Sequence, residues 1–200
     1  MKIIAISQRI DTSDYNEIRP QLDIRLYNFI ASAGYTPVPI PYYSFRKIRN
    51  DVLLKKWLVK IQPSGIVLSG GENIGSRIIR DNTEYFLINF SKKKRIPLLG
   101  ICRGMQILAK YFGSKIINVK NHVNTKHLIK NKNKKILVNS FHNLAIRDCP
   151  KDFKIKFKAD DEVIESIYSK KYKMEGWMWH PERYKKFRSF DLKSFRKLFR

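Results

Sequence analysis

Short apolar runs alternate with amphipathic stretches along the first half of the chain. Apolar runs without polar interruption are typical of strands buried on both faces, and they lie at residues 2–7, 35–40, 65–68 and 96–101. Between them, apolar side chains recur at helical spacing, which predicts helices over residues 19–33, 51–60, 81–93 and 103–112. This alternation predicts an α/β fold with three layers, in which a mostly parallel central sheet lies between flanking helices.

The chain changes character after residue 115. Five shorter β-like runs, separated by polar turns, lie at residues 116–119, 135–139, 154–158, 163–168 and 174–178. Residues 121–135 are rich in Lys and Asn, which predicts a mobile surface loop, whereas the apolar spacing in residues 184–200 predicts a short amphipathic helix. Because no repeat or linker interrupts the pattern, we expect residues 1–200 to form one domain.

Charge is the unusual feature of the composition. The chain has 41 Lys and Arg against 17 Asp and Glu, a formal net charge of +24, and no acidic residue lies between Glu84 and Asp148. Such a field would attract nucleic acid, an anionic lipid surface or a phosphorylated substrate. A base bias in the coding DNA would produce the same excess of Lys, Ile and Asn without a functional cause, and the sequence leaves both explanations open.

The rest of the composition narrows the class of protein. Hydrophobic residues make up 43% of the chain, as in a globular protein, and the two cysteines, Cys102 and Cys149, are too few for a disulfide framework. The first residues lack the long apolar run of a signal peptide, and no stretch reaches the roughly 18 apolar residues that span a bilayer. We therefore expect a soluble, cytoplasmic protein that has no membrane partner.

The segment around Cys102 carries the strongest chemical signal. An apolar run leads into Gly100-Ile101-Cys102-Arg103-Gly104, and a helix is predicted to follow directly. This strand–turn–helix context is typical of a nucleophile elbow, in which glycines permit the tight turn that exposes the central side chain. The start of the following helix favours a negative charge, so Cys102 is predicted to react as a thiolate.

A thiolate nucleophile needs a base, and the base needs a group that orients it. The segment Trp179-His180-Pro181-Glu182, near the end of the chain, supplies both. We predict that His180 takes and returns the proton, and that Glu182 holds its ring and stabilises the imidazolium. Cys102, His180 and Glu182 are therefore the predicted catalytic residues.

Backbone N–H groups are the usual donors to the oxyanion of an acyl-transfer reaction. The glycine-rich turn Ser69-Gly70-Gly71 follows a predicted strand and can expose the N–H of Gly71. The N–H of Arg103, directly after the nucleophile, is the second predicted donor.

These segments, in this order, resemble the class I glutamine amidotransferase fold, which is flavodoxin-like, and more narrowly its free-standing γ-glutamyl hydrolases. The resemblance covers nearly the whole chain and includes residues 19–41, 80–84, 138–142 and 175–182. It implies a hydrolase that releases glutamate from a small-molecule γ-glutamyl amide, without a metal or an organic cofactor. It further implies that the substrate contacts Gly70, Gln106, Ser140, Phe141 and His142.

Differences from the family pattern narrow the range of substrates that we expect for this chain. Residues 72–74, after the Gly-Gly turn, and residues 143–144, after His142, differ from those usual in γ-glutamyl-γ-aminobutyrate hydrolases. The chain is also shorter than those enzymes, and it looks most like the γ-glutamyl-CDP-amidate hydrolases of capsule phosphoramidate synthesis. These would release glutamate and cytidine diphosphoramidate, and an anionic, nucleotide-linked leaving group would suit the basic composition.

Other functions stay open from the sequence alone. The basic tail and the acid-free middle could bind nucleic acid, although no nucleic-acid motif is present. The chain could also be a glutaminase subunit that passes ammonia to a separate synthetase, or a γ-glutamyl-γ-aminobutyrate hydrolase. His122 and His127 could bind a metal together with Cys149, but they lack the paired spacing of the usual zinc sites, so the sequence predicts no metal. The oligomeric state is not predicted.

Overall fold

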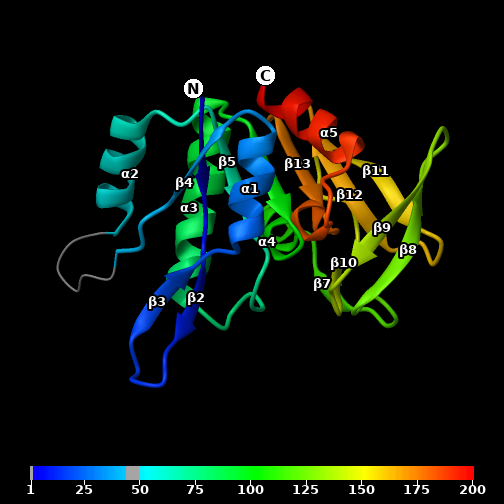
Figure 1. Ribbon diagram of the computed structural model, residues 1–200, viewed down its shortest axis with the longest axis horizontal. Coiled ribbons are helices and arrows are strands. Elements are labelled where there is room, and N and C mark those ends of the chain that lie inside the picture. The colour runs from blue at the N-terminus through cyan, green and yellow to red at the C-terminus, as the bar shows by residue number, and fades with distance from the viewer. Residues whose placement is uncertain (1, 44–49) are drawn as a thin grey trace.

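Nine strands form one sheet in the computed structural model, which describes residues 2–43 and 50–200. From edge to edge these are β4 (Thr36–Pro39), β1 (Ile3–Ile6), β5 (Gly65–Leu68), β6 (Leu98–Ile101), β13 (Met174–Trp177), β12 (Ile164–Ser169), β11 (Lys154–Ala159), β8 (Thr125–Lys130) and β9 (Lys135–Ser140). The strands from β4 to β13 pair in parallel. Beyond β13 the pairing is antiparallel. The sheet therefore has a parallel half, from β4 to β13, and an antiparallel extension on the other side of β13 (Figure 1).

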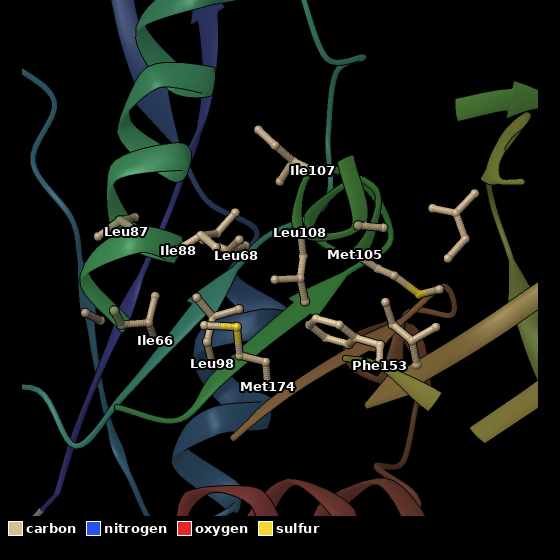
Figure 2. Packing of buried hydrophobic residues seen from close by; sticks show 14 of the residues in the cluster. Ile66, Leu68, Leu87, Ile88, Leu98, Met105, Ile107, Leu108, Phe153 and Met174 are labelled. Carbon is tan, nitrogen blue, oxygen red and sulfur yellow. The ribbon is translucent and has the colours of Figure 1, made fainter. Parts of the chain in front are cut away.

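Helices cover both faces of the parallel strands, which gives the three layers. One face carries α1 (Ile24–Ser32) and α5 (Ser189–Phe199), and the other carries α2 (Asn50–Ile61), α3 (Ile78–Lys94) and α4 (Arg103–Tyr111). Because side chains alternate along a strand, β5 contributes Val67 to the first core and both Ile66 and Leu68 to the second. In the second core these side chains lie among Leu87 of α3 and Leu108 of α4 (Figure 2).

These elements confirm the predicted fold class. The residues of β5 and β6 are buried throughout, as expected for strands with helices on both sides. The C-terminal helix α5 buries Phe195 and Phe199, which confirms the amphipathic pattern of the last residues. Among the described residues, no helix combines the length and the apolar character that crossing a membrane would require.

The predicted helix over residues 19–33 is wrong at its beginning. Strand β3 (Ile18–Gln21) occupies that part and pairs with β2 (Arg9–Thr12) in an antiparallel hairpin. Helix α1 starts only after Asp23, whose carboxylate accepts a hydrogen bond from the N–H of Arg25 at 2.9 Å. The hairpin projects from the molecule and is mostly exposed, so it lacks the apolar pattern of a buried strand (Figure 1).

The predicted mobile loop over residues 121–135 is also wrong. Strand β8 lies at its centre and pairs along its full length with β9. Only Ile129 of this strand is fully buried, so most of its Lys and Asn neighbours face solvent. Two further short strands, β7 (Ile116–Asn118) and β10 (Leu144–Ile146), form a separate antiparallel pair. Most of the Lys and Asn residues lie in the turns at residues 121–124 and 131–134, so the polar composition indicates these turns but not the strand between them.

Candidate active site

Cys102 lies at the junction of β6 and α4. It has φ 50° and ψ −109°, a conformation that side chains other than glycine rarely adopt. Neighbouring glycines permit the turn: a Cβ added at Gly104 would lie 2.1 Å from the carbonyl oxygen of Leu68, and one at Gly100 would lie 2.4 Å from the backbone of Gly104. The turn therefore holds Cys102 beyond the carboxyl end of β6, at the N-terminus of α4, as in a nucleophile elbow.

His180 and Glu182 follow β13, the parallel neighbour of β6. The N–H of Cys102 donates to the carbonyl of Trp177 at 2.7 Å, so the chain that leaves β13 passes beside the elbow. Nδ1 of His180 lies 2.6 Å from Oε1 of Glu182, and both side chains are buried. Because a carboxylate only accepts, Nδ1 carries a proton, which leaves Nε2 as the nitrogen that can exchange a proton with Cys102.

Two neighbours of His180 stabilise its protonated form. Burial alone would lower the pKa of the imidazole, but the Glu182 carboxylate and the Cys102 sulfur together raise it to about 9. The arrangement can therefore provide a nucleophile and a proton donor at the same time.

Asn139 of β9 holds the backbone of His180, although the two residues are 41 positions apart in the chain. Its side-chain oxygen accepts from the N–H of His180, and its amide donates to the carbonyl of His180, both at 2.8 Å. The backbone N–H of Asn139 donates to the hydroxyl of Tyr184 at 2.9 Å. Sequence reasoning missed Asn139 as a site residue, and its place within the resembling segment 138–142 was the only signal.

The loop after β5 lies directly against the His180 ring. A Cβ added at Gly70 would lie 2.8 Å from Cε1 of His180, and one at Gly71, which has φ +141°, would lie 2.6 Å from Nη1 of Arg80. Both positions therefore require glycine for close approach. Arg103 is the first residue of α4, so its N–H has no acceptor within the helix. The N–H of Arg103 directly follows Cys102 in the chain, and that of Gly71 belongs to the loop that lies against the His180 ring. Their role as oxyanion donors stays a prediction.

A buried ion-pair network connects this loop to the elbow. The Arg80 guanidinium donates to the carbonyl oxygens of Ser69 and Gly70, at 2.8 and 3.1 Å. It also pairs with Glu84 at 3.0 Å, and the other oxygen of Glu84 pairs with the Arg103 guanidinium. Burial would raise the pKa of Glu84, but Arg80 and Arg103 together lower it. The network explains why the side chain of Arg103 is buried while its backbone lies next to Cys102.

A cleft of about 230 Å³ opens beside His180 and Glu182, two of the three predicted catalytic residues. It is lined by Arg9, Gln21, Leu22, Asp23, Leu26, Ser69, Gly70, Gly71, His180, Glu182 and Arg183. Arg9 is exposed, and its guanidinium has no ion pair or hydrogen bond with any described residue. The Arg183 guanidinium stacks on the ring of Phe141 at 4.4 Å. Sequence reasoning missed both cations, because Arg9 reaches the cleft only through the hairpin and Arg183 only through the turn after His180.

Three residues predicted to contact substrate are buried and already donate hydrogen bonds to backbone carbonyls. Gln106 and His142 donate to Leu144, at 2.9 and 3.0 Å, and Ser140 donates to a carbonyl of the β7–β8 connection at 2.6 Å. Phe141 is partly exposed, and its ring lies edge-on to His180 with centroids 5.8 Å apart. The structure therefore brings Phe141 to the triad, while substrate contacts by the other three stay predictions.

Side chains that could hold a metal ion meet outside the triad. His122, His127 and Glu165 place three ligand atoms within 4.8 Å of one another. Cys149 is not part of this group: it packs at the edge of the second core, and burial raises the pKa of its thiol. The three residues come from the β7–β8 connection, β8 and β12, a combination that spacing along the chain does not reveal.

Comparisons with known proteins agree with this geometry. The chain matches the family model for glutamine amidotransferase class-I over residues 28–192. A γ-glutamyl-CDP-amidate hydrolase from Campylobacter jejuni is 35% identical over 190 residues, which cover 90% of each chain. Anthranilate synthase component 2 from Thermococcus kodakarensis is 29% identical over 136 residues, which cover 62% of this chain and 68% of that protein.

Solved structures share the fold. A candidate GMP synthase subunit from Thermoplasma acidophilum has a TM-score of 0.73 at 20% identity, covering 100% of this chain and 92% of that one. A glutamine amidotransferase from Thermotoga maritima has a TM-score of 0.62 at 19% identity, covering 90% of this chain and 76% of that one. At these identities the likeness concerns the fold alone.

Proposed function

Because this chain belongs to the class I glutamine amidotransferase family, we propose that it is a cysteine-dependent hydrolase that releases glutamate from γ-glutamyl-CDP-amidate. The observation that carries the proposal is the 35% identity, over 90% of both chains, to the Campylobacter jejuni γ-glutamyl-CDP-amidate hydrolase. The contacts among a cysteine, a histidine and a glutamate at a nucleophile elbow support the same chemistry. The second product is cytidine diphosphoramidate, a precursor for capsule phosphoramidate synthesis.

The reaction proceeds through a thioester. The Cys102 thiolate attacks the γ-carbonyl carbon, and the N–H groups of Gly71 and Arg103 donate to the oxyanion. His180 protonates the amide nitrogen as the C–N bond breaks, which frees the amidate and leaves a γ-glutamyl thioester on sulfur. His180 then takes a proton from water, which attacks the thioester and releases glutamate and the thiolate. Glu182 keeps His180 in the required tautomer throughout.

The cations at the cleft support an anionic leaving group. Arg9 and Arg183 both line it, and guanidinium groups bind phosphate oxygens through charge-assisted hydrogen bonds. The acid-free stretch between Glu84 and Asp148 adds positive potential over the same molecule. In this proposal Gly70 and Phe141, which border His180, contact the glutamyl part of the substrate.

The test is glutamate release by the purified protein from γ-glutamyl-CDP-amidate, γ-glutamyl-γ-aminobutyrate and free glutamine. We expect the highest kcat/KM with the CDP compound and a loss of turnover of roughly 10³-fold or more in Cys102→Ala. Cys149→Ala is the matched control, because it removes the other free thiol of the chain, which lies outside the site. It should retain activity, and circular dichroism should show that both variants are folded.

Other results would assign other functions. Preference for free glutamine would identify a glutaminase, and preference for γ-glutamyl-γ-aminobutyrate would identify the other hydrolase branch. Full activity of Cys102→Ala would contradict the cysteine mechanism itself. Absence of turnover together with strong, salt-sensitive binding of nucleic acid would favour a binding protein.

A further inference from the structure

Three of the four histidines of the chain meet at one buried carboxylate outside the triad. Nδ1 of His122, Nε2 of His127 and Nε2 of His142 lie 3.4, 3.3 and 3.3 Å from the same oxygen, Oε1 of Glu165. The side chains of His122, His142 and Glu165 are at most 3% exposed, and that of His127 is 18% exposed. A cluster so well shielded from water must satisfy its polar atoms internally.

Hydrogen bonds on the far side of two rings determine their tautomers. Nε2 of His122 lies 2.8 Å from a carboxylate oxygen of Asp161, and Nδ1 of His142 lies 3.0 Å from the carbonyl oxygen of Leu144. Both oxygens are acceptors only, so these two nitrogens carry the protons. In a neutral ring the other nitrogen presents a lone pair to Oε1 of Glu165, and a cation between the two atoms would satisfy both.

Three side chains of this cluster place ligand atoms close enough to share one ion. The ligand atoms of His122, His127 and Glu165 all lie within 4.8 Å of one another. Neither Nδ1 of His122, Nε2 of His127 nor Oε1 of Glu165 has a hydrogen-bond partner among the described residues. The two nitrogens lie 3.4 and 3.3 Å from Oε1 of Glu165, close to the separation of about 3.3–3.5 Å between ligand atoms around a tetrahedral zinc ion.

We propose that His122, His127 and Glu165 bind one divalent transition-metal ion of the zinc class. Imidazole nitrogens and a carboxylate oxygen are donors that Zn²⁺ accepts readily. Asp161 holds the His122 ring from behind, as acceptors commonly do for histidines that bind metal. Because the three ligands come from separate segments of the chain, the ion stabilises the fold by joining them.

The metal would stabilise the part of the sheet that positions His180, the predicted base. It would join β8 and β12 to the β7–β8 connection, which carries His122. The carbonyl of His122 accepts from the hydroxyl of Ser140 at 2.6 Å and from the N–H of His142 at 3.0 Å. The residue before Ser140 is Asn139, which holds the backbone of His180.

The test measures metal binding directly and does not depend on turnover. Untagged full-length protein carrying Cys102→Ala and Cys149→Ser is used, because thiols and histidine tags also bind Zn²⁺. After incubation with Zn²⁺ and desalting, mass spectrometry should find about one zinc per chain, the stoichiometry of a single site. The Co²⁺ form should show the visible absorption bands of tetrahedral cobalt, and Zn²⁺ should raise the Tm.

Adding His127→Ala should abolish the retained zinc, the cobalt bands and the zinc-dependent rise in Tm. The Tm of the metal-free protein should change little, because the His127 ring makes no hydrogen bond with any described residue. Lys126→Ala, an exposed neighbour on the same strand, is the matched control and should bind metal normally. Zinc absent from the parent protein, or retained equally by the His127→Ala variant, would overturn the proposal whatever the outcome of the hydrolase assay.

Discussion

At the scale of single residues, two neighbours affect different properties of His180, its protonation and its position. Glu182 contributes charge, because its carboxylate is the group beside Nδ1 that favours the imidazolium. Asn139 contributes position, because it binds both backbone groups of His180 and makes no contact with the ring nitrogens. The two effects can be separated experimentally.

Replacing Glu182 with Gln should move the pH dependence of the reaction. The pKa of His180 is about 9 in the folded protein because burial is outweighed by Glu182 and Cys102, and removing the carboxylate lowers it. His180 must be protonated to protonate the leaving nitrogen, so activity is lost as pH rises through this pKa. The alkaline limb of kcat/KM should therefore lie near pH 9 in the wild type and at lower pH in Glu182→Gln.

The measurement is glutamate release from neutral to strongly alkaline pH. Glu17→Gln is the control, because Glu17 pairs with Arg19 on the exposed hairpin, away from the triad, and its loss should leave the limb in place. An alkaline limb that is the same in the wild type and in Glu182→Gln would contradict the role assigned to this carboxylate.

Replacing Asn139 with Ala should lower kcat with little change in KM. The variant leaves the buried N–H and carbonyl of His180 without partners, which costs about 1–3 kcal/mol per group, and the imidazole loses its fixed position. Asn139 does not line the cleft, so substrate affinity should be nearly unchanged. Steady-state kinetics and urea unfolding measure both effects.

Asn143→Ala is a suitable control, since Asn143 is an exposed residue of the same type just beyond β9. A rise in KM at unchanged kcat would show that Asn139 contacts substrate instead of positioning His180.

At the scale of elements, the sequence predicts the structural features whose determining residues lie close together in the chain. The elbow requires only a buried strand, two close glycines and a helix start, all within residues 98–111. The hairpin of β2 and β3 could not be found in this way, because its strands are exposed and contain no apolar alternation. Strand β8 could not be predicted for the same reason. Its pairing with β9 depends on backbone hydrogen bonds, and its side chains are mostly polar.

Gly104→Ala should destabilise the protein through the contact between α4 and β5. The new Cβ would lie 2.1 Å from the carbonyl oxygen of Leu68, a backbone atom that cannot move without displacing the strand. Overpacking of this kind typically costs about 1–3 kcal/mol, and each kcal/mol lowers the Tm of a domain of this size by about 2–4 °C. Thermal unfolding measures the change, with Lys110→Ala on the exposed side of the same helix as control. Equal Tm values for the two variants would contradict the close packing.

At the scale of the whole molecule, the candidate site combines residues that the fold brings together from distant segments. Cys102, His180 and Glu182 could be predicted because each lies in a short motif. The motifs lie close together because β6 and β13 are neighbouring parallel strands. Arg9, Asn139 and the histidine cluster could not, because each reaches its place through pairing in the hairpin or in the antiparallel extension. When strands that are distant in the chain pair with each other, no fixed residue spacing in the sequence indicates which residues will meet.

The net charge of +24 raises the question of whether a local cation or the overall field serves an anionic substrate. Arg9 and Arg19 allow the two to be distinguished, because both lie on the same hairpin and only Arg9 lines the cleft. Arg9→Gln should reduce kcat/KM for γ-glutamyl-CDP-amidate about three- to tenfold at low salt, with a smaller effect at high salt where exposed charges are screened. Arg19→Gln removes the same charge and should have little effect, since its guanidinium pairs with Glu17. Equal reductions in the two variants would instead assign the attraction to the overall field, and the cleft would have no specific site for the phosphates.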